Sequence, residues 1–518
     1  MESRGLNVRM VKCDPYINVD AGTMSPYQHG EVYVTDDGAE TDLDLGNYAR
    51  FTKGRLSQAN SITTGQVYES VIRKEREGKY LGKCVQVIPH ITDEIKSRIL
   101  AVANENSDTD VVIIEIGGTV GDIESIPFIE VARQMIHEQG RKNAISVHLT
   151  LIPEVAGGEL KTKPTQHSVK AMLEKGIQPD ILICRSPVML DEPTCRKIAL
   201  FTNVDQDAVF TSPNIKTTIY QIPIIFSEQK LDQVILRKMG IESRHTNMKP
   251  WVSVMEKFSA RQGKARIGVV GKYMDIHDTY TSLYESLFHA GIECGVETEL
   301  VKIDSSVLEE NENADAVLGA NGLNVDCVLV PGGFGQRGIN GMIKAVSWAR
   351  VNKKPFMGIC LGMQVMVIEW ARYVLNWADA DSTEFTPNAK HPVVSLLDEQ
   401  VNVTNYGGTM RLGASETVNE DGSLIMAAYG EKRISERHRH RYEFSNQYRE
   451  EMTKSGLKLA AFNSDGTLVE CVEWPRSGEM SHPWGVAVQF HPEYKSKPMA
   501  ASPLFREFIF AVKKEKSQ

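Results

Sequence analysis

The sequence lacks three features that would place it in a specialised class of protein. It has no apolar run near the roughly 18 residues of a membrane-spanning helix, and its first residues contain no signal-peptide core. Its 8 cysteines form no CxxC pair, which argues against a zinc site and a disulfide framework. Its net charge of −9 argues against nucleic acid as a partner. We therefore expect a cytoplasmic protein that binds neither membranes nor nucleic acid.

The chain is too long for one domain, and its apolar pattern indicates two α/β domains. It has 518 residues, of which 42% are hydrophobic and 24% charged, as in ordinary globular proteins. Strand-like runs that are apolar on both faces alternate with helix-length stretches, which is typical of a parallel sheet covered on both sides. We predict two doubly wound, mainly parallel domains at 1–240 and 265–518, joined by a charged linker at 241–264 that contains one helix.

A candidate nucleophile lies in PFMGICLGMQ (355–364), where an apolar strand passes through a glycine to Cys360. A cysteine that opens a helix is exposed by the turn, and the helix N-terminus lowers the pKa of its thiol. The backbone N–H of Leu361 would be placed to stabilise an oxyanion. A buried structural cysteine beside two glycines fits this segment equally well.

Two further segments favour the catalytic interpretation. VPGGFGQRG (330–338) ends a strand in a glycine-rich turn whose N–H groups could complete an oxyanion hole. WGVAVQFHPEY (484–494) ends a strand at His491, which could act as a base, with Glu493 orienting its ring. Alone, His-Pro-Glu at a strand end would more often be an ordinary loop.

Together and in this order, the three segments resemble the class I glutamine amidotransferases. The resemblance implies that Cys360 is the nucleophile, His491 the base and Glu493 the residue that orients it. Glutamine needs an anion for its ammonium group and a cation for its carboxylate, which Glu384 and Arg441 would supply. The residues expected to contact glutamine or its oxyanion are Gly333, Leu361, Gln364, Glu384 and Arg441.

The run RHRHR (437–441) should form a strand with its arginines on one face and its histidines on the other. A solvated charged strand is the ordinary interpretation of such a run. We do not expect His438 and His440 to bind a metal, because nothing near them in the sequence completes a site.

The first half resembles one family of synthetases. The stretch 14–51 is long, aperiodic and rich in Gly, Asp and Tyr, which is typical of a site-forming loop. This stretch closely resembles the cytidine triphosphate synthases. The resemblance of the whole chain to that family runs from about residue 5 to 510. Four more segments carry the resemblance: EIGGTVGDIESIPFIE (115–130), GELKTKPTQHSVK (158–170), GGTMRLG (407–413) and ERHRHRYE (436–443).

The resemblance implies glutamine-dependent amination of UTP to CTP with ATP and Mg²⁺, the last step of de novo CTP synthesis. It also implies inhibition by the product CTP, activation by GTP through a flexible lid resembling GGTMRLG, and a homotetramer, with filaments as a further assembly.

The same resemblance assigns roles in the first half. Asp44 and Glu115 match the family's metal positions, and carboxylates suit a hard cation. Without the family, Glu115 could be a plain strand-end carboxylate and Lys197 a solvated charge. The residues expected to contact nucleotides are Lys12 near the transferred phosphate, Asp122, Ile123 and Glu124 at the cytosine ring, Lys161 and Gln166 at UTP, Lys197, and Asp44 through the metal.

The sequence departs from the family at its start. Members begin with a strand, a glycine-rich phosphate loop and a helix, but Met1 stands a few residues before the later part of the match, and no GxxxxGK[ST] occurs. GVVGKY (268–273) has the wrong spacing and lies in the other domain. We expect a P-loop-like synthetase domain that lacks its first strand, with unpaired backbone groups and exposed apolar side chains.

Three explanations remain open for this departure. The sequence could be an incomplete version of a normal enzyme. It could be a short form without synthetase activity that serves as a regulatory or structural subunit of the full-length enzyme. A glutaminase that serves another acceptor is the third alternative.

Overall fold

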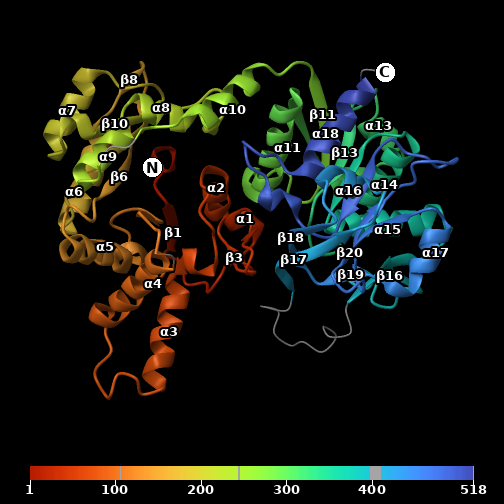
Figure 1. Ribbon diagram of the computed structural model, residues 1–518, viewed down its shortest axis with the longest axis horizontal. Helices are drawn as coiled ribbons and strands as arrows, with labels where there is room; N and C mark the ends of the chain where they lie inside the picture. The colour runs from red at the N-terminus through yellow and green to blue at the C-terminus, as the bar shows by residue number, and fades with distance from the viewer. Residues whose placement is uncertain (106, 243–244, 397–409, 517–518) are drawn as a thin grey trace. The chain divides into compact units, whose positions relative to one another are not determined.

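The computed structural model describes residues 1–105, 107–242, 245–396 and 410–516. The chain forms two compact units (Figure 1). The first contains Met1–Asp20 and Thr52–Glu256, and the second contains Ala21–Phe51 and Lys257–Gln518. The segment 21–51 therefore folds with the second unit, although both of its ends are joined to the first. No helix in the described part of the chain is long and apolar enough to cross a membrane.

The first unit is built on two separate parallel sheets, with strand orders β4-β1-β5 and β10-β9-β6 among its described residues. The strands are β1 (Val8–Asp14), β4 (Ser61–Thr63), β5 (Val111–Ile116), β6 (Val147–Leu151), β9 (Ile181–Ser186) and β10 (Val209–Pro213), with a small antiparallel pair β7 (Glu154–Val155) and β8 (Glu159–Leu160). The helices are α3 (Thr64–Arg76), α4 (Thr92–Asn104), α5 (Ile126–Gln139), α6 (Lys163–Glu174), α7 (Glu192–Thr202), α8 (Ile222–Glu228) and α9 (Leu231–Met239).

Apolar side chains are exposed where these two sheets end. Helix α5 connects β5 to β6, yet the two strands belong to different sheets. A βαβ connection normally joins parallel strands of one sheet, which then cover each other's edges. The predicted exposure of apolar side chains is confirmed: Ile113 on β5 is 41% exposed, and Val147, Leu149 and Leu151 on β6 are 37%, 71% and 54% exposed.

The second unit contains a mixed sheet with strand order β12-β11-β13-β14-β22-β21-β20-β17-β18. From β12 to β22 the neighbours are parallel, as predicted, whereas β21, β20, β17 and β18 run antiparallel to their neighbours. These strands are β11 (Lys264–Gly271), β12 (Glu297–Asp304), β13 (Cys327–Val330), β14 (Phe356–Ile359), β17 (Arg411–Asn419), β18 (Arg433–His440), β20 (Lys458–Asn463), β21 (Val469–Glu473) and β22 (Gly485–Val488). A smaller sheet has the order β15 (Ala380–Ser382), β16 (His391–Leu396) and β19 (Tyr442–Phe444).

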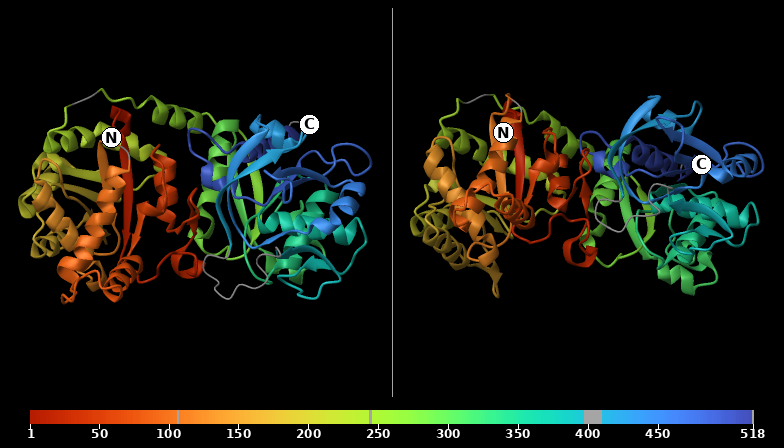
Figure 2. Two further views of the ribbon diagram at one scale, coloured as in Figure 1. Left: turned by 60° about the horizontal axis from the view of Figure 1, so that its bottom comes forward. Right: turned by 90° about the horizontal axis from the view of Figure 1, so that it is seen from below.

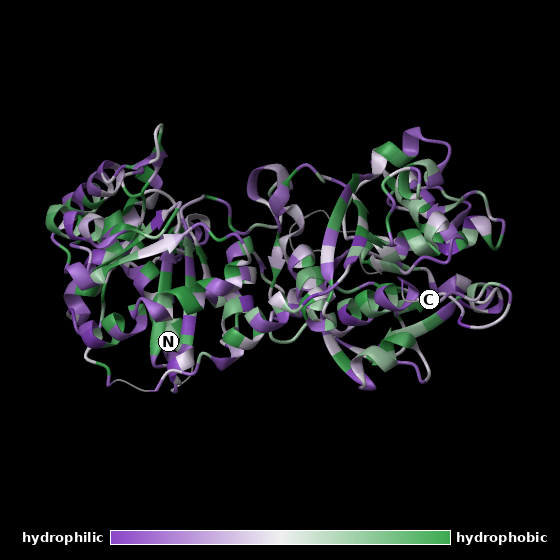
Figure 3. Cartoon of the chain, turned by 90° about the horizontal axis from the view of Figure 1, so that it is seen from above, coloured by the Kyte–Doolittle hydropathy of each residue, from purple (hydrophilic) through white to green (hydrophobic). Residues whose placement is uncertain are grey.

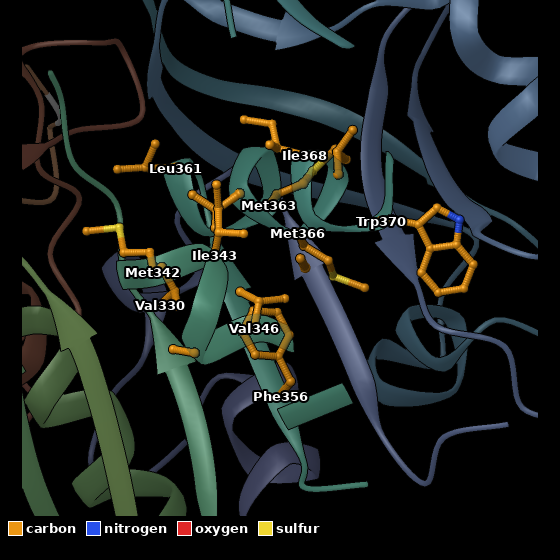
Figure 4. Packing of buried hydrophobic residues seen from close by; sticks show 14 of the residues in the cluster. Val330, Met342, Ile343, Val346, Phe356, Leu361, Met363, Met366, Ile368 and Trp370 are labelled. Atoms are coloured by element: carbon orange, nitrogen blue, oxygen red, sulfur yellow. The ribbon is translucent and has the colours of Figure 1, made fainter. Parts of the chain in front are cut away.

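Helices cover both faces of the larger sheet. Residues of β13 alternate between two buried clusters: Val328 and Val330 pack against α14 and α15 (Figure 4), and Cys327 and Leu329 pack against α11 and α18. Many helices carry hydrophilic and hydrophobic residues on one ribbon, as expected of elements with one face on a core (Figure 3). The helices are α11 (Thr281–Cys294), α12 (Ser305–Glu310), α13 (Ala314–Leu318), α14 (Ile339–Val351), α15 (Leu361–Tyr373), α16 (Leu424–Tyr429), α17 (Arg449–Lys454) and α18 (Pro503–Lys516).

The segment 21–51 forms short elements that pack beside α11, as Figures 1 and 2 show. They are α1 (Pro26–His29), β2 (Tyr33–Val34), β3 (Glu40–Thr41) and α2 (Leu43–Phe51). The expected linker contains one helix, α10 (Lys249–Ser259). The first unit ends within this helix at Glu256, and the second unit resumes at Lys257.

Candidate active site

Cys360 lies on a sharp turn between β14 and α15. Its φ is 53° and its ψ is −102°, a conformation that costs energy for a residue with a side chain. The flanking glycines make the turn possible, because a Cβ on Gly362 would lie 2.2 Å from the carbonyl oxygen of Val330. A strained turn at a strand end that opens a helix is the arrangement expected of a nucleophile.

His491 and Glu493 lie beside this turn, directly after β22. His491 Nδ1 is 2.7 Å from Glu493 Oε1, and both side chains are buried. Burial opposes a charge on His491, but Glu493 and Cys360 outweigh it and raise the pKa of His491 to about 10. Cys360, His491 and Glu493 thus lie in one buried group, as the sequence predicted.

The glycine-rich turn after β13 approaches the same group. A Cβ on Gly332 would lie 2.8 Å from His491 Cε1 and 3.5 Å from Cys360 Cβ. A Cβ on Gly333 would lie 3.3 Å from Leu361 Cδ2. The two predicted oxyanion residues, Gly333 and Leu361, are therefore neighbours.

The other predicted glutamine contacts surround this turn. Glu384 Oε1 accepts a hydrogen bond of 2.7 Å from the N–H of Gly335. Burial raises the pKa of Glu384, while this hydrogen bond and the charges of Lys272 and Arg441 oppose the rise. Gln364 is buried on α15 and donates to the carbonyl oxygen of Tyr442 at 3.0 Å. Glu384 and Arg441 thus lie within electrostatic range of each other.

The alternation predicted for RHRHR is confirmed along β18, but Arg437 and Arg439 are paired with the segment 21–51 rather than solvated. Arg437 Nε donates to Asp36 Oδ1 at 2.6 Å, and Arg439 Nε donates to Glu40 Oε1 at 2.8 Å. The backbone of β18 borders the catalytic group, because the carbonyl oxygen of Arg437 accepts from the N–H of His491 at 2.8 Å. Residues 21–51 therefore lie behind the strand that borders Cys360, His491 and Glu493, which the sequence did not indicate.

His438 and His440 are buried on the other face of β18, 3.0 Å apart between Nδ1 and Nε2. Contrary to expectation, carboxylates do lie near them. His438 Nε2 is 3.7 Å from Glu470 Oε2, and His440 Nδ1 is 3.5 Å from Glu443 Oε1. Arg411 already supplies a cation to both carboxylates, at 2.7 Å from Glu470 and 3.5 Å from Glu443. Both carboxylates near the two histidines are therefore paired with Arg411.

Glu31 is a buried carboxyl group in the segment 21–51. Its oxygens accept hydrogen bonds from the N–H of Ser282 at 3.1 Å and from the Ser282 hydroxyl at 2.6 Å. Burial raises the pKa of Glu31 to about 7, although Ser282 and Arg50 oppose the rise. The folded protein therefore holds a proton on Glu31 at pH values where the unfolded chain has lost it.

This difference predicts a pH-dependent gain in stability for Glu31→Gln. Because the folded pKa is raised, the stability contributed by protonated Glu31 is complete below the unfolded value of about 4.3 and is lost as the pH rises to about 7. The amide introduced by the substitution would stay neutral and keep an acceptor for Ser282. We expect the variant to be more stable than the wild type at pH 8, by roughly 2–3 kcal/mol, with no gain at pH 4.5.

Thermal unfolding from pH 4.5 to 8 would measure this effect, with Glu312→Gln as the control because Glu312 is exposed. Parallel pH profiles for the wild type and Glu31→Gln would contradict the prediction.

In the first unit, Lys12 lies between two carboxylates at the end of β1. Its Nζ is 3.4 Å from Glu115 Oε1 and 3.7 Å from Asp14 Oδ1, and the Glu115 side chain remains 48% exposed. Exposed carboxylate oxygens at a strand end suit Mg²⁺. The described residues contain no cluster of three or more His, Cys, Asp or Glu arranged to hold a metal. Asp44 lies on α2, in the second unit.

The other nucleotide contacts predicted in the first unit lie around α6 and before α5. Lys161 forms a 2.6 Å ion pair with Glu159, and its hydrogen bond and charge lower the pKa of Glu159, with a smaller contribution from the charge of Lys197. Gln166 is buried one turn into α6. The range 122–124 is exposed before α5. GGTMRLG (407–413), the predicted lid, lies partly outside the described residues.

Two family models match the chain. Residues 1–241 match the model "CTP synthase N-terminus", and residues 275–511 match "Glutamine amidotransferase class-I". The chain is 52% identical to the CTP synthase of Geobacter sulfurreducens, over 99% of this chain and 93% of that one. It is 51% identical to the CTP synthase of Carboxydothermus hydrogenoformans, over 99% of this chain and 94% of that one.

A solved structure is similar to part of the chain. It is described as "Trypanosoma brucei CTPS - glutaminase domain with bound acivicin", with 39% identity, 48% of this chain and 94% of that chain covered, and a TM-score of 0.45. Nothing in the comparisons supports the alternative of a regulatory form without synthetase activity. Since both family models match and full-length relatives align along nearly the whole sequence, the chain belongs to the CTP synthase family.

Proposed function

We propose that the chain aminates UTP to CTP at the expense of ATP, with ammonia released from glutamine. The predicted domain 265–518 hydrolyses glutamine, and the predicted domain 1–240 activates and aminates UTP. Family membership supports the reaction as a whole. The arrangement of Cys360, His491 and Glu493 is the observation that supports the assignment of glutamine hydrolysis to the second unit.

Glutamine hydrolysis would proceed through a thioester. Cys360 Sγ attacks the amide carbon, and His491 takes the thiol proton. The negative oxygen that forms faces the N–H groups of Gly333 and Leu361. His491 then gives its proton to the leaving ammonia, and water cleaves the thioester to release glutamate. Against the effect of burial, Glu493 and the Cys360 thiolate raise the pKa of His491, so the proton taken from the thiol stays on His491 until ammonia leaves.

Substrate glutamine would be held by opposite charges. Glu384 receives its ammonium group, Arg441 receives its carboxylate, and Gln364 supplies a polar contact. Charge-assisted pairs of this kind fix both the position and the orientation of a small amino acid.

In the predicted domain 1–240, lysines would contact the nucleotides and carboxylates would hold the metal ion. Lys12 faces the transferred phosphate, Lys161, Gln166 and Lys197 contact UTP, and the range 122–124 recognises the cytosine ring of CTP as inhibitor. Asp44 and Glu115 would hold Mg²⁺, which neutralises phosphate charge when it is bound. The half-exposed side chain of Glu115 at the end of β5 supports this assignment.

Regulation and assembly are further parts of the proposal. GTP would activate glutamine hydrolysis, and the chain would form homotetramers that can extend into filaments. All eight cysteines are free, which suits the reducing cytoplasm.

CTP formation from UTP, ATP and Mg²⁺ tests the proposal when glutamine and ammonium chloride are compared as nitrogen sources. We expect CTP with either source, because ammonia bypasses the glutaminase. Glutamine hydrolysis without CTP formation from either source would overturn the proposal and favour a glutaminase that serves another acceptor.

A further inference from the structure

Lys272 is a buried charged residue for which the mechanism above gives no role. It follows β11 directly, within the GVVGKY stretch that lacks the spacing of a phosphate loop. Its side chain is only 1% exposed, among the largest fully buried side chains of the described residues. Burying an ammonium group is costly unless hydrogen bonds and charges compensate for the lost water.

The ammonium group of Lys272 is held by the glycine-rich turn. Nζ donates to the carbonyl oxygen of Phe334 at 2.8 Å and also to that of Gly335. The N–H of Gly335 donates to Glu384 Oε1 at 2.7 Å. The carbonyl of Phe334 and the N–H of Gly335 belong to one planar peptide unit. Lys272 and Glu384 therefore hold opposite ends of this unit and prevent it from rotating.

A second peptide unit of the turn is fixed from its carbonyl side. The hydroxyl of Tyr280 donates to the carbonyl oxygen of Gly332 at 3.4 Å. In a trans peptide the N–H points away from the carbonyl, so the N–H of Gly333 points away from Tyr280. The orientation of the Gly333 N–H thus depends on how the whole turn is anchored.

The anchored turn contacts the reacting residues. A Cβ on Gly333 would lie 3.3 Å from Leu361 Cδ2 and 3.9 Å from Lys272 Cδ, so Gly333 is close to both residues. Gly332 lies against His491 and Cys360. A small rotation of the turn would therefore move the Gly333 N–H relative to Cys360.

We propose that Lys272 is a positioning residue that holds the Phe334 and Gly335 carbonyls, so that the Gly333 N–H faces the oxyanion formed at Cys360. This inference rests on the proposed glutaminase function of Cys360. A lysine suits the task because its bonds to carbonyl oxygens are charge-assisted and stronger than neutral ones. Burial lowers the pKa of Lys272 to about 8, and the nearby charge of Glu384 opposes this.

Lys272→Met tests the inference, because methionine fills similar space without a donor. Loss of an oriented oxyanion donor reduces kcat by about 10²-fold, and this is the expected result for glutamine hydrolysis. The oxyanion exists only in the transition state and intermediate, so KM for glutamine should stay within about threefold. Alkylation of Cys360 by iodoacetamide should keep its wild-type rate, since that reaction forms no oxyanion.

Lys344→Met is the matched control. Lys344 Nζ also donates to carbonyl oxygens, those of Leu308 and Glu309 at 3.0 Å and that of Asn311 at 2.8 Å. None of these belongs to the glycine-rich turn, so the control should retain wild-type kcat. Lys272→Gln, which keeps a neutral donor, should recover part of the kcat lost in Lys272→Met and serves as the test if the methionine variant does not fold.

Three results would overturn the inference. They are no change in kcat or KM in Lys272→Met, a raised KM with unchanged kcat in that variant, and equal losses of kcat in Lys272→Met and Lys344→Met. The second result would assign Lys272 to substrate binding through Glu384. Persistence of glutamine hydrolysis in Cys360→Ala would instead overturn the proposed function itself, whatever Lys272 does.

Discussion

Cys360→Ala is expected to abolish CTP formation from glutamine and to leave CTP formation from ammonium chloride unchanged. Without Sγ no thioester can form, and removal of a nucleophile costs on the order of 10⁴-fold or more in kcat. Ammonia reaches the synthetase reaction without this step. Assays with the two nitrogen sources on one preparation measure both effects.

Cys471→Ala is the control for this experiment. Cys471 is fully buried on β21 in the same unit, so its replacement removes a thiol from the core and leaves the catalytic turn intact. We expect both activities to persist in the control. If Cys360→Ala still hydrolysed glutamine, or if both nitrogen sources failed equally, Cys360 would not be the nucleophile of a separate glutaminase.

The catalytic group could be predicted because each of its members follows a short local rule. Cys360 comes after a buried strand and before a helix, between glycines that the turn requires. His491 and Glu493 follow another buried strand, and the carboxyl ends of parallel neighbours lie at one edge of a sheet. These rules involve only residues that are neighbours in the chain, so a single sequence is enough to apply them. The geometry was predictable, but the catalytic roles of these three residues stay predictions, as do the roles of the glutamine and nucleotide contacts.

The place of the segment 21–51 could not be predicted in this way. Its contacts with β18 join residues about four hundred positions apart, such as Asp36 and Arg437, and nothing in either local pattern specifies the other. The alternation of RHRHR could be predicted, but its burial could not, because a solvated strand and a buried, ion-paired strand have the same sequence pattern. Burial of charge depends on a partner that only the fold brings near.

Lys272 shows the same limit. Glycine and lysine in GVVGKY suggested only a phosphate loop, which the spacing excluded. The role inferred for Lys272 depends on the carbonyl groups of a turn more than sixty residues later in the chain, at Phe334 and Gly335. Every residue has a backbone carbonyl group, so a sequence does not indicate which of them a lysine will bind. A lysine that anchors a turn in this way can be identified only from a structure.

The second large effect concerns Arg437, the residue that joins the segment 21–51 to the turn that carries His491. Its guanidinium donates to Asp36 and to the Tyr33 hydroxyl at 2.6 Å, to the Val34 carbonyl at 3.0 Å and to the Tyr494 carbonyl at 3.3 Å. The ring of Tyr494 stacks on His491, with centroids 5.2 Å apart and an interplanar angle of 19°. Arg437 therefore stabilises both the segment and the turn that carries the base.

Arg437→Met should destabilise the second unit and slow glutamine hydrolysis. Removing the guanidinium leaves the partly exposed Asp36 charge and the buried neutral acceptors around it without their donor, which costs about 1–3 kcal/mol. We expect a lower melting temperature, faster proteolysis within the range 33–40, and at least a tenfold loss of glutaminase kcat. Arg437→Lys keeps the charge but not the forked geometry, so it should recover only part of each loss.

Arg433→Met provides the comparison on the same strand. Arg433 pairs with Glu416 at the surface, where both side chains are about half exposed, at 59% and 46%. Exposed pairs contribute about 0–1 kcal/mol, so this control should keep the stability, protease resistance and glutaminase rate of the wild type. Similar small losses in both variants would mean that the segment 21–51 does not support the catalytic turn. A large loss confined to Arg437→Met would mean that a segment lying within the match to the CTP synthase N-terminus is structurally part of the glutaminase.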